Sequence, residues 1–245
     1  MSRMIFQQLG IILLSILFLA TLYLSIWIGA LIFGFVLIWI IFGIFSIRYS
    51  PFIRSVCKLS GLKREIVISF DDGPFPNTIK VLDALKKNNA KACFFLTGKQ
   101  VEKYPEIAKR IAQEGHLIGN HTYSHKVKSL FCGSAGYQNE IEKTNEIIYR
   151  VTGIECKYFR FPFGVTQPIN AYVVKQKRLV SMGWSIRSLD TLSKDNSAVI
   201  RRIQKKWRPG YILLLHDQLP QTIDILEGLF EYTVKNKIKC VIPNL

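Results

Sequence analysis

The feature that most constrains the fold of this chain is a long segment without charge. From Ile5 to Ile47 no side chain is charged, and most side chains are large and apolar. A helix that crosses a membrane needs about 20 such residues, so this segment is long enough for two spans. A cleaved signal peptide would have a much shorter apolar core, followed by a small-residue cleavage site. The sequence therefore predicts a transmembrane hairpin. Its expected parts are residues 1–48 as a whole, helices at about 5–25 and 29–47, and a reversal at Ser25–Gly29.

Basic residues flank the uncharged segment on both sides. Arg3 precedes it, and five basic residues follow it: Arg48, Arg54, Lys58, Lys63 and Arg64. We expect residues 49–64 to form a juxtamembrane linker and residues 65–245 to form a globular domain of common size. Positive charge near the ends of spans favours the cytoplasmic side, so a hairpin with two basic ends predicts a cytoplasmic domain. A single or broken span would instead place the domain outside.

The formal net charge of +16 raises the question of a nucleic-acid partner. Lys and Arg are scattered over predicted helix faces, without interleaved aromatic residues or a recognition motif, so we expect no nucleic-acid binding. The basic surface fits a domain held near anionic membrane lipid. Five cysteines at irregular spacing, without a CxxC pair, predict neither a disulfide framework nor a thiolate zinc site. Unpaired thiols are typical of a reducing compartment.

Strand-like and helix-like segments alternate through the rest of the chain. Such alternation predicts a parallel sheet with helices outside, either open or closed into a barrel. The expected strands are Glu65–Phe70, Lys91–Leu96, His116–Gly119, Tyr158–Phe161, Leu179–Ile186, Tyr211–Leu215 and Lys237–Ile242. The expected helices are Thr78–Asn88, Val101–Gln113, Asn139–Thr152, Pro168–Lys177, Ala198–Trp207 and Thr222–Lys235.

The first of these strands ends in two consecutive carboxylates. The stretch Ile66–Pro74 reads IVISFDDGP, an apolar run of the kind found in buried parallel strands. Chemistry in α/β folds lies at the C-terminal ends of such strands. Because neighbouring side chains on a strand point to opposite faces, Asp71 and Asp72 can serve one site only where the strand breaks, as Gly73-Pro74 indicates. The alternative is an Asp-rich turn that caps the next helix.

Three of the four histidines lie near the predicted C-terminal ends of strands. His121 and His125 form HxxxH, and residues four apart on one helical turn can bind one metal ion, although helix surfaces also produce this pair by chance. His216 closes another apolar run at the same end of the sheet. His116 instead begins its strand, and we interpret it as structural.

A carboxylate from the Asp pair can complete a metal site. Two histidines plus one carboxylate leave an open coordination position for water, as in catalytic zinc sites. Zinc lowers the pKa of that water toward about 7, which supplies hydroxide at neutral pH. The second Asp can then act as a base.

Five short motifs resemble those of the polysaccharide deacetylase family, also called the NodB-homology domain or carbohydrate esterase family 4. They are SFDDGP at Ser69–Pro74, HTYSH at His121–His125, RFPFG at Arg160–Gly164, SLDT at Ser188–Thr191 and LLH at Leu214–His216. They occur in the family's order and cover Glu65–Leu245, while the uncharged segment lies outside the resemblance. The resemblance implies an irregular (β/α)7-type barrel after the hairpin. It also implies hydrolysis of the N-acetyl or other N-acyl amide of an amino sugar.

The family's roles transfer to matching residues. The resemblance implies that Asp71 is the catalytic base and that Arg160 orients it. It implies that Asp72, His121 and His125 bind one divalent metal ion, for which we expect zinc.

The later motifs carry the remaining roles. The backbone N–H of Phe163 matches the oxyanion donor, where the family usually has Tyr. His216 matches the general acid, and Asp190 matches the carboxylate that pairs with it and raises its pKa. Pro162 and Trp184 are expected to contact the substrate.

One position departs from the family pattern. The residue after Asp190 is usually Trp, which helps to wall the active-site groove, and here it is Thr191. This difference puts the usual long-polymer substrate in doubt. Trp184 can supply a wall instead, or can be a core aromatic residue.

These observations predict a membrane-anchored, metal-dependent carbohydrate N-deacetylase. With a cytoplasmic domain, its substrate would be a lipid-linked N-acyl amino sugar. The alternative is an extracytoplasmic enzyme that acts on peptidoglycan or a chitin-like polymer. A non-catalytic carbohydrate-binding module would be expected to have lost a ligand, base or acid. A glycosidase needs two carboxylates about 5 Å or more apart across the scissile bond, and Asp71 and Asp72 are poorly placed for that.

Overall fold

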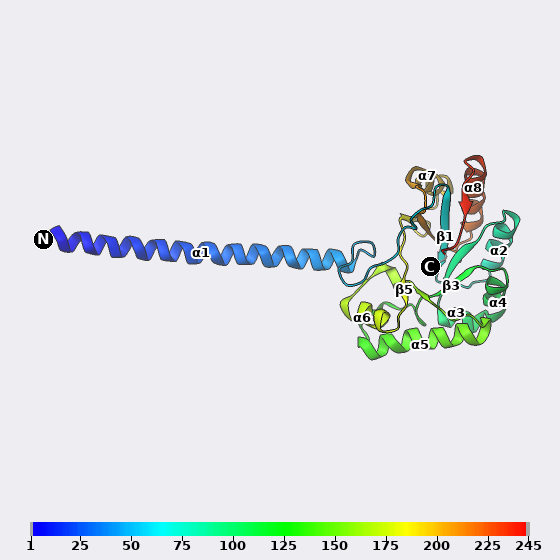
Figure 1. Ribbon diagram of the computed structural model, residues 1–245, viewed down its shortest axis with the longest axis horizontal. Coiled ribbons are helices and arrows are strands. Elements are labelled where there is room, and N and C mark those ends of the chain that lie inside the picture. The colour runs from blue at the N-terminus through cyan, green and yellow to red at the C-terminus, as the bar shows by residue number, and fades with distance from the viewer. Residues whose placement is uncertain (1, 244–245) are drawn as a thin grey trace. The chain divides into compact units, whose positions relative to one another are not determined.

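A computed structural model describes the backbone of residues 2–243 and the side chains of residues 12–243. The chain divides into two compact units, Met1–Phe42 and Gly43–Leu245. The second unit, which carries the strands labelled in Figure 1, contains every residue assigned above to the site.

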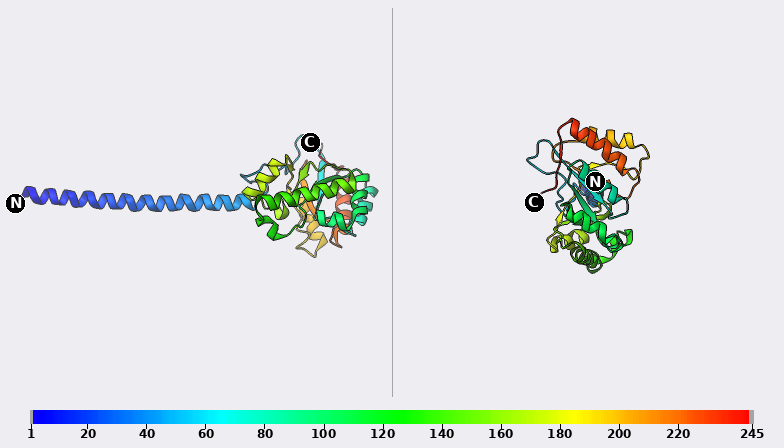
Figure 2. Two further views of the ribbon diagram at one scale, coloured as in Figure 1. Left: turned by 90° about the horizontal axis from the view of Figure 1, so that it is seen from below. Right: turned by 90° about the vertical axis from the view of Figure 1, so that its right-hand side faces the viewer.

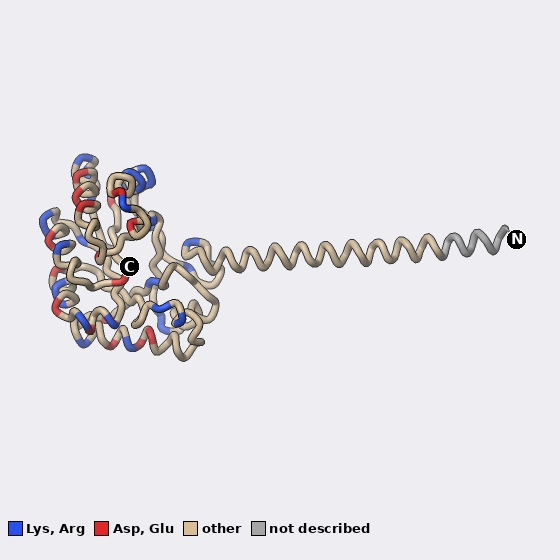
Figure 3. The backbone as a smooth tube through the Cα atoms, turned by 180° about the vertical axis from the view of Figure 1, so that it is seen from behind, with Lys and Arg blue, Asp and Glu red and all other residues tan. Residues whose placement is uncertain are grey.

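The uncharged segment up to Ile44 lies in one continuous helix, α1 (Ser2–Ile44), so the hairpin predicted from the sequence is not present. The expected reversal at Ser25–Gly29 lies inside α1 because no residue there breaks a helix. The Ser25 hydroxyl donates a hydrogen bond to the carbonyl of Thr21 (2.8 Å), which satisfies it within the helix. Glycine in a helix costs only about 1 kcal/mol relative to alanine. Among the described residues, one helix, Ile12–Ile44, is long and apolar enough to cross a membrane. The tube in Figure 3 shows no charged residue over this range.

The second unit is built on a curved parallel sheet. Its strands are β1 (Glu65–Asp71), β2 (Ala92–Leu96), β3 (Leu117–Asn120), β4 (Tyr158–Phe159), β5 (Val180–Ser181), β6 (Ile186–Arg187), β7 (Ile212–His216) and β8 (Lys239–Cys240). The order is β5-β4-β3-β2-β1-β7-β6, and β8 pairs with the start of β1. All described pairings between strands are parallel, so the predicted α/β class is confirmed and the sheet is a half-barrel. The single strand expected at Leu179–Ile186 is two short strands, β5 and β6, at opposite ends of the sheet order.

Helices cover the outside of the sheet. They are α2 (Thr78–Lys87), α3 (Gly98–Lys103), α4 (Pro105–Gln113), α5 (Gly133–Thr152), α6 (Pro168–Gln176), α7 (Asn196–Lys206) and α8 (Thr222–Lys235). Figure 2 shows α5 and α8 on opposite sides of the strands, as Figure 1 does. Two short 3-10 helices, η1 (Val127–Phe131) and η2 (Pro162–Gly164), interrupt the loops. The helix predicted over Val101–Gln113 is divided into α3 and α4 at Tyr104, because Pro105 begins a new helix.

Residues 49–64 pack against the sheet, whereas the sequence suggested a linker. Val56 forms a parallel bridge with Met182, just after β5, and Lys58 forms an antiparallel bridge with Tyr211, just before β7. Ile53 and Cys57 are buried in an apolar cluster with residues of β4, α5 and α6. This segment therefore lies across the interval between the two ends of the sheet and belongs to the same unit.

Candidate active site

Alternation along β1 brings the first Asp to the site. Ile66, Ile68 and Phe70 are buried in the large core between the sheet and the outer helices. The residues between them point to the concave side, where the Ser69 hydroxyl donates to the carbonyl of Leu213 (2.7 Å). Asp71, the last residue of the strand, lies on that same side and is 4% exposed. The strand therefore delivers one carboxylate to the interior of the half-barrel.

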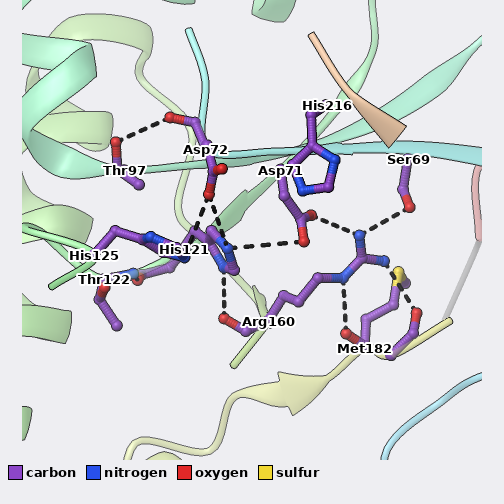
Figure 4. A network of polar contacts seen from close by, with 12 residues as sticks. Ser69, Asp71, Asp72, Thr97, His121, Thr122, His125, Arg160, Met182 and His216 are labelled. Carbon is purple, nitrogen blue, oxygen red and sulfur yellow. Dashed lines mark hydrogen bonds and ion pairs between the residues drawn. The ribbon is translucent and has the colours of Figure 1, made fainter. Parts of the chain in front are cut away.

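A buried arginine holds this carboxylate. The guanidinium of Arg160 donates to Asp71 Oδ1 (2.7 Å) and to Ser69 Oγ (2.8 Å) through Nη1. It also donates to the carbonyls of Met182 (3.1 Å) and Gly183 (3.0 Å) after β5 (Figure 4). Arg160 is fully buried, and its guanidinium stacks 3.9 Å from the centre of the Phe95 ring. One side chain thus ties β1 to the far end of the sheet and fixes the direction of Asp71.

The second Asp turns away from the first. Asp72 has a φ of 73°, in the left-handed region, so its side chain does not point in the direction that regular strand alternation would give it. The Thr97 hydroxyl donates to the carbonyl of Asp72 (3.1 Å), and the Thr97 N–H donates to the carbonyl of Gly73 (3.0 Å). The break that the sequence predicted at Gly73 is therefore held by the residue after β2.

The two histidines of HxxxH lie on a loop after β3, not on the helical turn that the spacing suggested. Thr122 and His125 both have positive φ, 64° and 49°, which folds the loop back on itself. Glu140, on α5, holds the loop, because its carboxylate accepts hydrogen bonds from the N–H groups of Tyr123 (3.0 Å) and Ser124 (2.8 Å). The two imidazole rings lie 4.7 Å apart between centres. The rings converge through loop geometry, which a helical pattern cannot show.

The donor atoms of Asp72, His121 and His125 fit a metal ion. Asp72 Oδ1 lies 3.5 Å from His121 Nε2 and 3.3 Å from His125 Nε2. All candidate ligand atoms lie within 4.8 Å of one another. Asp72 Oδ1 is buried and has no hydrogen-bond partner in the described part of the chain. His121 Nδ1–H donates to the carbonyl of Arg160 (2.8 Å), which turns Nε2 toward the carboxylate (Figure 4).

The surroundings of this cluster favour the metal-binding forms of Asp72 and His125, whereas the charges of Asp71 and Asp72 outweigh burial and raise the pKa of His121. Burial opposes ionisation of Asp72, but the neighbouring imidazoles of His121 and His125 outweigh this and lower its pKa to about 2. Burial, together with the neighbouring charge of His121, lowers the pKa of His125 to about 4. At neutral pH this leaves an ionised carboxylate and a neutral His125, the states in which these side chains act as ligands.

His216 forms a second, separate pair with Asp190. Its Nδ1 donates to Asp190 Oδ1 (3.0 Å), and its backbone N–H donates to Asp190 Oδ2 (2.7 Å). Burial alone would lower the pKa of His216. The hydrogen bond to Asp190 and the charges of Asp190, Asp71 and Asp72 outweigh burial and raise that pKa to about 9. His216 is therefore protonated at neutral pH, and Nε2 is the nitrogen that can donate to a ligand.

These groups surround one cavity of about 240 Å³. Its lining comprises Asp71, Asp72, His121, His125, Phe163, Trp184, Arg187, Thr191, Leu214 and His216. Phe163 has a φ of 59°, and its ring lies 4.5 Å from that of His125 between centres. Trp184 packs over Gly164, where an added Cβ would lie 2.6 Å from the indole, so Trp184 forms part of the wall. Pro162 is buried in η2 and is not part of the lining.

A family model described as polysaccharide deacetylase matches residues 58–183 of this chain. The chain belongs to that family. The match contains Asp71, the three candidate metal ligands and Arg160, and it ends before Asp190 and His216.

Individual relatives extend the similarity within the polysaccharide deacetylase family. The chain is 36% identical over 172 residues to a peptidoglycan-N-acetylglucosamine deacetylase of Bacillus cereus, a match that covers 68% of this chain and 62% of the relative. A crystal structure of a peptidoglycan N-acetylglucosamine deacetylase matches with a TM-score of 0.71 and 32% identity. That match covers 76% of this chain and 89% of the other.

The deacetylase fold by itself does not establish activity. A mutant of a family pseudoenzyme, with restored enzymatic activity, matches with a TM-score of 0.66 and 25% identity. The match covers 73% of this chain and 65% of the other. Inactive and active proteins therefore share this fold, so the argument for activity must rest on the side chains of the site.

The structure also shows residues of the candidate site that the sequence reasoning missed. Ser69 positions Arg160, and Glu140 positions the loop that carries His121 and His125. Arg187 lines the cavity. Asp217, next to His216, is fully buried and accepts a hydrogen bond from the Thr78 hydroxyl. Burial raises the pKa of Asp217 to about 7. Of these residues, only Ser69 and Asp217 lie in or beside a motif. There, a polar residue in or directly after an apolar run is a local signal that could have identified them.

Proposed function

We propose that this chain is a metal-dependent N-deacetylase that removes acetyl groups from amino sugars of peptidoglycan. The observation that carries the proposal is that a base, a metal-binding triad and an acid line one cavity. A pseudoenzyme or a binding module would be expected to lack one of them. The Bacillus cereus relative supports peptidoglycan, rather than a lipid-linked amino sugar, as the substrate.

Asp71 and His216 would move the protons of the reaction. Asp71, held by Arg160, accepts a proton from water as the water oxygen adds to the carbonyl carbon of the acetamide. His216 gives its Nε2 proton to the sugar nitrogen as the C–N bond breaks, and acetate and the free amine leave. Acid catalysis of this kind typically contributes about 10²–10⁴-fold.

Asp72, His121 and His125 would hold the metal ion, for which we propose zinc, because two imidazoles and a carboxylate form a common catalytic zinc ligand set. When bound, such an ion is a Lewis acid and lowers the pKa of water. Phe163 lines the cavity, and its backbone N–H is our candidate for the oxyanion donor. One such donor is typically worth about 3 kcal/mol in the transition state.

The test of this proposal is acetate release by the full chain in detergent. Zinc-loaded protein is incubated with peptidoglycan and, separately, with a lipid-linked N-acetyl amino sugar. We expect acetate from peptidoglycan, and none from peptidoglycan with the Asp71→Asn variant, although that variant should retain zinc. Acetate from the lipid-linked sugar alone would overturn peptidoglycan as the substrate, and acetate from neither would overturn the proposed activity.

We further propose that α1 anchors the domain to the outer side of the cytoplasmic membrane, where peptidoglycan lies. A single span places its two ends on opposite sides of a membrane, unlike the hairpin predicted from the sequence. The basic residues after α1 alone would favour the cytoplasmic side, but large domains cross membranes largely regardless of charge.

The native cysteines provide a test of this orientation. Cys132 is exposed, whereas Cys57, Cys93 and Cys156 are buried. A membrane-impermeant maleimide should therefore label intact cells at Cys132, and the Cys132→Ser variant should lose most of that label. Labelling of Cys132 only after permeabilisation would place the domain in the cytoplasm and return the lipid-linked sugar to first place.

A further inference from the structure

Arg187 is a cation of the cavity that the mechanism does not use. It follows Ile186 on β6, where Ile186 is buried in the core against the helices and Arg187 is exposed. The register pairs Arg187 with Leu214 of β7, and both residues line the cavity. Alternation along this short strand therefore directs the arginine toward the site.

The guanidinium of Arg187 forms no ion pair with any residue in the described part of the chain. The carboxylates of the cavity are engaged elsewhere: Asp71 with Arg160, and Asp72 with His121 and His125. Asp190, which lies behind His216, is likewise occupied, because it accepts hydrogen bonds from Ser188, Thr191 and His216. A positive charge at the cavity is thus available to a ligand.

The backbone around Arg187 is held in place. Arg202, on α7, donates through Nε to the carbonyl of Arg187 (2.9 Å). The small side chain of Thr191 also lines the cavity, so no bulky residue at that position fills the space. The whole chain has a formal net charge of +16. The electrostatic field of a strongly positive protein attracts anionic substrates, which favours binding of a negatively charged ligand near Arg187.

We propose that Arg187 binds a carboxylate of the substrate, so that the site prefers a carboxylate-bearing N-acetyl amino-sugar strand over a neutral one. A guanidinium binds a carboxylate through two parallel hydrogen bonds, which gives both attraction and direction. In peptidoglycan, a muramic acid residue without a stem peptide fits this description, because its free 3-O-lactyl carboxylate lies on the carbon beside the one that bears the acetamide. This inference rests on the proposed deacetylase function and specifies the substrate class of the same site.

The test uses two glycan strands that differ only in charge. One strand bears free lactyl carboxylates, and in the other the same groups are N-methylamides. For the zinc-loaded full chain we expect kcat/KM, measured by acetate release, to be at least about tenfold higher for the carboxylate strand, as a charge-assisted hydrogen bond would give. Arg187→Gln should abolish this preference, so that the ratio of kcat/KM between the two strands falls to within about twofold of one. Arg187→Lys, which keeps the charge but not the paired donors, should retain part of the preference.

A matched control and a binding measurement make the outcome decisive. Arg201→Gln removes a cation that lines a different cavity, on α7, and should leave the preference unchanged. Equilibrium binding of both strands is measured as well, so that discrimination is tested even if no acetate is released. The inference would be overturned if the wild-type protein did not discriminate between the strands in either measurement. It would also be overturned if Arg187→Gln lowered kcat/KM and affinity for both strands by the same factor. Loss of acetate release with intact discrimination in binding would instead count against the proposed catalytic function alone.

Discussion

Replacement of Asp190 by Asn should separate the acid role of His216 from every other function of the site. Asp190 accepts hydrogen bonds from Nδ1 and from the backbone N–H of His216, and it is the main cause that raises the pKa of His216 to about 9. Without this carboxylate, burial opposes the charged imidazole and only the charges of Asp71 and Asp72 still favour it, so we expect its pKa to return to about 6.5. Asp190 is not one of the candidate metal ligands, so zinc binding should persist.

The magnitude follows from the fraction of His216 that is protonated. At pH 8, a pKa of about 9 leaves about 90% of the imidazole protonated, whereas a pKa of about 6.5 leaves about 3%. We therefore expect kcat/KM of Asp190→Asn to be about 30-fold below wild type at pH 8 and close to wild type at pH 5.5. The pairing of His216 with Asp190 also contributes to the stability of the fold, and this contribution likewise decreases as the pH rises. A raised histidine pKa stabilises the fold fully below about pH 6.5, and this contribution is lost as pH rises through about 9.

The assay is a pH profile of acetate release from pH 5 to 10, with zinc content measured for each protein. We expect the alkaline limb to lie near pH 9 in the wild type and to move down by at least two pH units in the variant. An unchanged alkaline limb, or an equal loss of activity at every pH with normal zinc content, would refute the acid role assigned to His216.

Further predictions concern the metal, the base and the turn after β1. His121→Ala should lose bound zinc and activity. His116→Ala should keep both but lower the free energy of unfolding by about 1–3 kcal/mol, because His116 Nδ1 accepts a hydrogen bond from the Ala92 N–H in the core. Zinc analysis and urea unfolding of the two variants check this prediction. Asp71→Asn should keep wild-type zinc content and lose turnover, and measurable turnover at the wild-type rate would contradict the base assignment. Gly73→Ala should lower the free energy of unfolding by about 1–3 kcal/mol, because its Cβ would lie 2.6 Å from Asp217 Oδ2; an unchanged melting temperature would show that the turn can yield.

The sequence predicted the elements of the second unit because their patterns are local. Apolar runs such as Ile66–Phe70 fix buried strands, and helices such as Thr222–Lys235 follow from their apolar stripes and ends. The errors arose where tertiary contacts decide. No local signal shows that residues 49–64 lie across the ends of the sheet, or that Leu179–Ile186 divides into strands at opposite ends of the sheet order.

The candidate site could be predicted largely because its residues follow strands whose C-terminal ends meet at one edge. What could not be predicted is how they are held. Glu140 is an ordinary helical residue in the sequence, yet it folds the loop that brings His121 and His125 together. Arg187 lies in no motif, and only the pairing of β6 with β7, which sets Arg187 beside Leu214, places it at the cavity.

The separation of Asp71 from Asp72 explains how two adjacent carboxylates can take different roles. Had both stayed on a regular strand, they would have pointed to opposite faces, and only one would have reached the site. The left-handed conformation of Asp72 turns its oxygen toward two imidazoles, while Asp71 remains on the strand and binds Arg160. Asp71 is therefore paired with Arg160, and Asp72 lies against the two imidazoles, so these groups offset the repulsion between two adjacent charges in a buried cavity. Asp72 Oδ1 has no hydrogen-bond donor among the described residues, which fits its proposed role as a metal ligand, whereas Arg160 orients Asp71 as its proposed role as a base requires.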